Sequence, residues 1–107
     1  MKNEQVAEAF KQGRTAKTKH FFIKKNVIYS YGYHFPIVIK FINQNILLFN
    51  KDGYSVTTAR HKNLVKREFV GFTIIELKTE QLKDIINKGI TDINELYLNE
   101  LSKGVYI

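Results

Sequence analysis

The fold of this chain is decided by residues 27–61, which read VIYSYGYHFPIVIKFINQNILLFNKDGYSVTTARH. This stretch holds the densest run of aromatic and β-branched residues, which are typical of strands, together with the only proline of the sequence. Turn-forming residues divide it into short segments. Among them is Asp52-Gly53, because glycine readily adopts the positive φ angle that tight hairpins need. The pattern predicts a β-meander that leads into a helix.

Six segments rich in apolar and β-branched residues are predicted as strands. They are residues 20–23, 27–31, 34–42, 46–50, 54–56 and 71–77. The first two flank Lys24-Lys25-Asn26 and are predicted to form a hairpin, because asparagine suits a turn position. Pro36 has no amide hydrogen for a sheet ladder, so its strand is expected to lie at an edge or to begin at this residue.

Four segments with apolar residues at helical spacing are predicted as helices. They cover residues 3–12, residues 58–68, residues 80–88, and a last segment that ends near Gly104. The expected N-caps are Asn3, Thr57 or Thr58, Thr79, and Thr91 or Asp92. The last two helices are expected to form an antiparallel hairpin.

Together these elements predict a single domain over residues 1–107. A β-rich core at residues 19–77, with one helix at 58–68, lies between an N-terminal helix at 1–13 and a helical hairpin at 79–103. The predicted class is α+β, with an antiparallel meander sheet of four to six strands covered on one face by helices.

The composition fits a globular intracellular protein. Apolar residues make up 44% of the 107 residues and aromatic residues 13%, which is enough for a packed core. The absence of cysteine excludes disulfides, thiolate nucleophiles and cysteine-ligated zinc, and it suits a reducing compartment. No signal peptide is recognisable, and no segment has the roughly 18 apolar residues of a membrane span. We therefore expect a cytoplasmic protein without membrane partners.

The net charge of +7 is unevenly distributed along the chain. Residues 1–70 hold 13 cations against 4 acidic residues, whereas residues 71–107 hold 4 cations against 6. A basic front indicates a partner with negative potential, such as nucleic acid or an acidic protein groove. The alternative is that these lysines are ordinary solvated surface residues.

Candidate catalytic and metal-binding residues do not form a known pattern. His20, His34 and His61 follow no known ligand spacing, and His61 is predicted on the inward face of its helix, as a hydrogen-bonded core residue. Serine and threonine residues occur nearby, but none has the glycine pattern of a nucleophile elbow. No glycine-rich phosphate loop is present. The sequence therefore predicts no enzyme, no cofactor and no metal site. The alternative is an enzyme or a metal protein in which the three histidines converge on one ion.

A binding surface has more support. Tyr29, Tyr31 and Tyr33 alternate, which places them on one face of a strand, although Gly32 allows Tyr33 to leave this register. Aromatic side chains beside cations suit base stacking, phosphate contact and protein hot spots. The alternative is that these tyrosines pack under a helix with their hydroxyl groups at the rim.

The helix at 58–68 extends this predicted surface. Its N-terminal amides, with Arg60 and Lys62, could hold a phosphate or a carboxylate; an ordinary capped and solvated helix is the alternative. We expect the tyrosine-bearing sheet and the cationic start of this helix to form one exposed docking face. The predicted binding residues are Tyr31, Tyr33, His34, Thr58, Arg60, His61 and Lys62.

Two motifs within SYGYHFPI (residues 30–37) and FNKDGYSVTTARHKNLV (residues 49–65) resemble a family of small proteins. These come from phages and other mobile elements of Gram-positive bacteria and carry Tyr-Gly-x-His-Phe-Pro-Ile, followed by Asn, Tyr-Ser-x-Thr-Thr and His. The matching positions are Tyr31, Gly32, His34, Phe35, Pro36 and Ile37, then Asn50, Tyr54, Ser55, Thr57, Thr58 and His61. About half of the chain is covered, and residues after 70 lie outside the match.

The family that the chain resembles has no general biochemical assignment, so what the resemblance implies about function is indirect. Small proteins of this origin often bind host machinery, and anti-CRISPR inhibitors of Cas9-type nucleases are one such class. The resemblance implies a non-enzymatic protein that binds a host protein or nucleoprotein complex and inhibits or modulates nucleic-acid handling. The alternative is direct binding of DNA or RNA through a basic, tyrosine-bearing sheet face.

Overall fold

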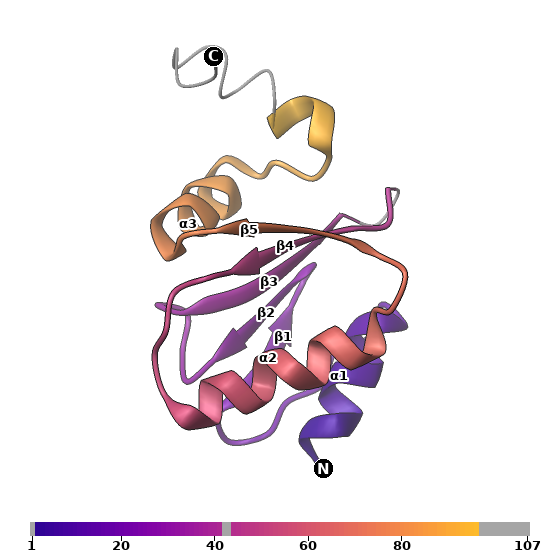
Figure 1. Ribbon diagram of the computed structural model, residues 1–107, viewed down its shortest axis with the longest axis vertical. Coiled ribbons are helices and arrows are strands. Elements are labelled where there is room, and N and C mark those ends of the chain that lie inside the picture. Colours follow the sequence, from indigo (N-terminus) through magenta and orange to yellow (C-terminus); the bar gives the residue numbers. More distant parts are fainter. Residues whose placement is uncertain (1, 42–43, 97–107) are drawn as a thin grey trace.

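The computed structural model describes residues 2–41 and 44–96 of the chain. In chain order its elements are α1 (Asn3–Lys11), β1 (Phe21–Lys24), β2 (Val27–Ser30), β3 (Pro36–Phe41), β4 (Ile46–Asn50), α2 (Val56–Glu68), β5 (Thr73–Leu77) and α3 (Thr79–Lys88). Figure 1 shows the sheet as a middle layer, with α1 and α2 on one side and α3 on the other. The class is α+β, as predicted.

The five strands form one sheet in the order β1-β2-β3-β4-β5. The first three pairs are antiparallel, and β5 pairs with β4 in parallel. A parallel pair needs a crossover connection, and α2 supplies it between β4 and β5. The sheet is therefore a four-stranded meander with one parallel strand added at its edge.

Pro36 begins β3, which lies between β2 and β4 rather than at an edge. The second of the two expectations for this residue is thus confirmed. A register shift in the pairing of β2 and β3 leaves Ile37 without a partner, so the strand bulges there. Because of this bulge, Ile37 and Val38 contribute to the same core.

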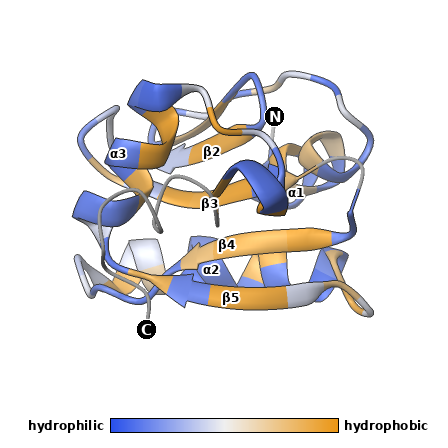
Figure 2. Ribbon diagram, turned by 90° about the horizontal axis from the view of Figure 1, so that it is seen from above, coloured by the Kyte–Doolittle hydropathy of each residue, from blue (hydrophilic) through white to orange (hydrophobic). Residues whose placement is uncertain are grey.

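Helices cover both faces of the sheet, whereas the sequence predicted one covered face. One core packs the sheet against α1 and α2 and includes Val6, Phe10, Val65 and Phe69. The other packs it against α3 and includes Leu82 and Ile85. The reason is that β2 and β3 are buried along their whole length and therefore need a partner on each side. Figure 2 shows hydrophobic residues running along β3 and β4 between these layers.

The predicted strand at 54–56 is wrong, because α2 begins earlier than expected. Ser55 has an extended backbone, and its hydroxyl accepts the amide hydrogen of Thr58, so Ser55 is the N-cap and Val56 the first helical residue. Neither Thr57 nor Thr58 is the cap.

Two other predicted caps are also shifted by one residue. Asn3 and Thr79 are the first residues of α1 and α3, preceded by Lys2 and Lys78. The side chains of Asn3 and Thr79 make tertiary hydrogen bonds instead, Asn3 with Thr18 and Thr79 with Asn50.

The predicted helix after α3 begins as expected. The Asp92 carboxylate accepts the amide hydrogen of Glu95, and residues 93–96 are helical. The rest of that prediction, from residue 97, lies outside the described residues. Within the described part of the chain, no helix is long and apolar enough to cross a membrane.

Candidate functional site

The residues of the predicted docking face do not lie on one surface. The Tyr31 ring lies 5.5 Å from that of Tyr54, which contacts Phe35 in the core under α1 and α2. Tyr33 packs instead against Tyr29, which belongs to the core under α3. The cause is local: Tyr31 has a φ of 72°, in the left-handed region, so the alternation of β2 ends before it. The expectation of one continuous face is therefore wrong.

Two of the predicted binding residues, Thr58 and His61, are buried. They form a buried polar centre with Ser30 and Asn3. The Ser30 hydroxyl lies 2.9 Å from both the Thr58 hydroxyl and His61 Nδ1. The Asn3 amide nitrogen lies 3.4 Å from His61 Nε2, and Thr18 donates to the Asn3 carbonyl oxygen. Because an amide nitrogen only donates, Nε2 accepts and the proton sits on Nδ1, which donates to Ser30.

The His61 imidazole is neutral in this environment. Burial, together with the nearby charge of His20, lowers the pKa of His61 from its ordinary value to about 4. The ring stacks on Phe21 at 4.2 Å and is 1% exposed. The Ser30–His61 pair has the spacing of a nucleophile and its base, but Nδ1 carries the proton and Ser30 is fully buried, so the pair is not arranged to attack a substrate. The pair joins α2 to the sheet, which agrees with the prediction that His61 is a core histidine.

Lys62 is also engaged within the fold. Its ammonium donates to the Asp52 carbonyl oxygen at 2.6 Å, and burial lowers its pKa. The Asp52 carboxylate accepts the amide hydrogen of Thr79 at 2.8 Å, and this bond lowers the pKa of that carboxyl. These contacts join the loop after β4 to α2 and α3. Arg60, one turn into α2, is exposed to solvent.

The remaining predicted residues lie near the start of α2. His34 Nε2 lies 3.3 Å from the Tyr54 hydroxyl, and both side chains are exposed. The half-buried Tyr31 ring lies between His20, at 4.5 Å, and Tyr54. The sequence predicted Tyr31 and His34 here, but it gave no indication of the role of Tyr54 as their common neighbour.

Tyr33 belongs to a different surface, which we call the hairpin surface and define as Phe22, Lys24, Tyr29 and Tyr33. Tyr33 is 60% exposed and contacts Phe22 and Tyr29 edge-on, at 5.1 and 5.0 Å between ring centroids. The Lys24 ammonium lies over the Tyr33 ring, 5.1 Å from its centroid. Burial raises the pKa of Tyr29. A supported aromatic ring beside a cation is thus presented to solvent.

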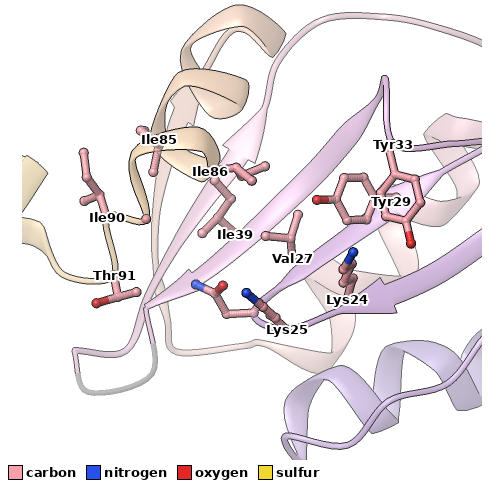
Figure 3. A pocket seen from close by; sticks show the side chains of 12 residues that line it. Lys24, Lys25, Val27, Tyr29, Tyr33, Ile39, Ile85, Ile86, Ile90 and Thr91 are labelled. Atoms are coloured by element: carbon pink, nitrogen blue, oxygen red, sulfur yellow. The ribbon is translucent and has the colours of Figure 1, made fainter.

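A cavity of about 420 Å³ opens beside the hairpin surface, between the β1–β2 turn and the end of α3. It is called the tyrosine cavity below. Figure 3 shows isoleucine and valine side chains on one side of it and the two tyrosines and two lysines on the other. Its lining is Lys24, Lys25, Asn26, Val27, Tyr29, Tyr33, Ile39, Ile85, Ile86, Gly89, Ile90 and Thr91. The described residues that line it include no acidic side chain.

A second cavity, of about 350 Å³, lies beside the C-terminal end of α1 and is called the basic cavity. It is lined by Phe10, Lys11, Gln12, Gly13, Arg14, Lys25, Asn26, Lys40 and Phe72, again with no acidic side chain among these described residues. Lys40 is 8% exposed and donates to the carbonyl oxygens of Phe10 and Lys11 at 2.8 and 3.2 Å. Burial lowers the pKa of Lys40.

The sequence did not identify these cavities. Lys24-Lys25-Asn26 was interpreted only as a turn, and the single signal for Lys40 is a lysine inside the apolar run of β3. Over residues 2–41 and 44–96, no three His, Asp or Glu side chains are grouped so as to hold a metal ion. No family model, curated protein or solved structure matches the chain.

Proposed function

We propose that this protein is a non-enzymatic binding protein that docks on host nucleic-acid-handling machinery and inhibits or modulates it by occlusion. The observation that carries the proposal is the hairpin surface. The Tyr33 side chain is 60% exposed, and the Lys24 ammonium lies over its ring. Exposed aromatic anchors beside cations are typical of binding hot spots.

The buried polar centre supports adhesion over turnover. Ser30 and His61 have the spacing of a nucleophile and its base, but they are 0% and 1% exposed and satisfy each other and their neighbours. Their hydrogen bonds are the ones that a folded core needs. The residues best suited to chemistry are thus engaged in holding α2, and the solvent-facing residues are suited to contact.

The charge distribution bears on the kind of partner. A chain with a net charge of +7 does not imitate DNA, so a protein target would offer an acidic or apolar site, or a bound RNA. The phage and mobile-element resemblance points to a Cas9-type nuclease with its guide RNA as the target to try first. Steric blockade would be sufficient for inhibition.

The test is a DNA-cleavage titration with a purified Cas9-type nuclease–guide RNA complex from a Gram-positive bacterium. We expect inhibition to saturate near one equivalent of the protein, with a stable complex in size-exclusion chromatography. Changing Lys24→Glu together with Tyr33→Ala should abolish both effects. Lys51→Glu, an exposed charge reversal at the opposite end of the sheet from the β1–β2 turn, is the control.

Two results would contradict the proposal. One is the absence of complex and inhibition at a large excess of protein. The other is complete inhibition at far less than one equivalent, which would indicate turnover.

Direct binding of DNA or RNA is the second candidate function. It is favoured by the two cavities, whose described lining residues include five cations and no acidic residue. Such binding depends on phosphate contacts and must therefore weaken steeply as salt is raised.

A further inference from the structure

The tyrosine cavity and the basic cavity meet at the β1–β2 turn. Lys25 and Asn26 line both. The tyrosine cavity lies on the face of the sheet covered by α3, since Val27 and Ile39 belong to that core. The basic cavity lies on the other face, where Lys40 contacts Phe10 and Phe69. A ligand that crosses the turn therefore reaches two sites of different chemistry.

The tyrosine cavity suits a flat, largely apolar group with polar edges. Its volume of about 420 Å³ falls within the range of small-molecule sites. Ile39, Ile85 and Ile90 provide apolar contact, while the hydroxyl groups of Tyr29 and Tyr33 and the side chain of Asn26 offer hydrogen bonds. A nucleobase has these properties, and the exposed Tyr33 ring offers a stacking partner.

The basic cavity suits phosphate groups. Lys11, Arg14, Lys25 and Lys40 line it, and no acidic side chain does so among the described residues. Lys40 is held by the last carbonyl groups of α1, where the helix dipole is negative. Lys40 offsets that partial charge, so the exposed Lys11 and Lys25 remain for an anionic ligand. The exposed Arg14 donates to the Gln12 side-chain oxygen and adds positive charge to the same cavity.

We infer that single-stranded nucleic acid crosses the β1–β2 turn, with one base in the tyrosine cavity and backbone phosphates at Lys25 and in the basic cavity. The inference rests on the proposed function, since the strand would be the nucleic-acid part of the partner. A duplex keeps its bases stacked and is too stiff to pass between two faces of so small a sheet, whereas a single strand can splay a base and bend. An acidic peptide would pair with the lysines but would not fill the apolar part of the tyrosine cavity.

The test uses the full chain and fluorescently labelled single-stranded DNA and RNA of about 12 nucleotides, a length within the site sizes of single-strand binding proteins. Fluorescence anisotropy measures affinity at about 50 and 200 mM salt, with the matching duplex in parallel. We expect the single strands to bind more tightly than the duplex and to lose affinity as salt is raised.

Four variants locate the site. Lys25→Glu should weaken binding at least about 10-fold, because it places an acid between the two cavities. Tyr33→Ala should weaken it about 5- to 100-fold by removing the stacking ring, while Tyr33→Phe, which keeps the ring and lacks only the hydroxyl, should lose less affinity than Tyr33→Ala. Lys51→Glu makes the same charge change at the far end of the sheet and should cost less than about 3-fold. Thermal unfolding verifies that each variant is folded.

Three outcomes would overturn the inference. They are no affinity for any single strand at low salt, equal losses for Lys25→Glu and Lys51→Glu, and displacement of the oligonucleotide by a poly-glutamate peptide at comparable concentration. The nuclease titration and the oligonucleotide titration can fail independently of each other. If the nuclease complex binds and oligonucleotides do not, only this inference fails; if oligonucleotides bind and no nuclease complex does, the proposed docking function fails.

Discussion

The buried polar centre and the hairpin surface differ in how far solvent reaches their polar side chains. In the polar centre, Ser30 and His61 are enclosed between α2 and the sheet, and each polar group has a partner. At the hairpin surface, Tyr33 and Lys24 lie on the outside. A serine–histidine pair is therefore not in itself a reactive site, because burial determines whether a substrate can reach it.

The largest expected effect is on the buried polar centre. His61→Ala should lower the free energy of unfolding by about 3–5 kcal/mol, because it leaves a cavity beside Phe21 and removes one hydrogen-bond partner from Ser30 and one from Asn3. Urea denaturation measures it. Arg60→Ala, an exposed position on the same helix, is the matched control. A loss below about 1 kcal/mol would mean that the centre does not hold α2.

The pH dependence of stability is the next effect. The pKa of His61 is about 4 in the folded protein, below its value near 6.5 in an unfolded chain, so the unfolded state binds the proton first as pH falls. The contribution of His61 to the free energy of unfolding is therefore fully present above about pH 6.5. It falls by about 3 kcal/mol between pH 6.5 and 4 and changes little below that.

Urea denaturation at pH 7, 5.5 and 4.5 measures this slope, and a variant with a non-titrating residue, His61→Gln, should flatten it. The Asp52 carboxyl, whose pKa is lowered by the Thr79 amide, loses its contribution only below the ordinary pKa of aspartate. An unchanged slope in His61→Gln would show that other groups produce the effect.

The two neighbouring tyrosines of the hairpin surface differ in burial in the same way, since Tyr29 is 6% exposed and Tyr33 is 60% exposed. Tyr29→Ala should cost about 3–4 kcal/mol of unfolding free energy, whereas Tyr33→Ala should cost less than about 1 kcal/mol. Thermal or urea unfolding of both variants decides this. A large loss for Tyr33→Ala would assign that ring to stability rather than to a contact surface.

The smallest expected effect concerns Arg60, which the sequence predicted as a binding residue. Arg60→Ala should change the free energy of unfolding by less than about 0.5 kcal/mol and leave single-strand affinity within about 3-fold. Anisotropy with the same labelled oligonucleotide measures the second quantity. A loss of affinity as large as that of Lys25→Glu would show that the nucleic-acid site includes the start of α2.

Local signals predicted most of the elements of the fold. Residues 46–50 form β4 as predicted, and the hairpin around Lys25 and Asn26 was placed within one residue at either end. These features depend on strand composition and turn chemistry, which act between near neighbours. His61 was also predicted correctly as a hydrogen-bonded core residue, because its position on the apolar side of α2 follows from helical spacing.

The features that were missed depend on contacts between distant residues. No pattern in residues 73–77 indicates that β5 runs parallel to β4, since that is decided by the crossover through α2. Asn3 and Thr79 look like caps, but tertiary hydrogen bonds engage their side chains. The left-handed backbone of Tyr31 separates it from Tyr33, and few sequences place a tyrosine there. The hairpin surface depends on the last of these features, so it could not be separated from the start of α2 by sequence alone.

Hydrogen–deuterium exchange with and without the single-stranded oligonucleotide is the most direct test of whether the strand crosses the β1–β2 turn, because it maps contact along the whole chain without substitution. We expect slower exchange on binding in β1, β2 and the turn at Lys25 and Asn26, with α2 unchanged. Slower exchange confined to residues 54–62, or no change anywhere at saturating oligonucleotide, would contradict it.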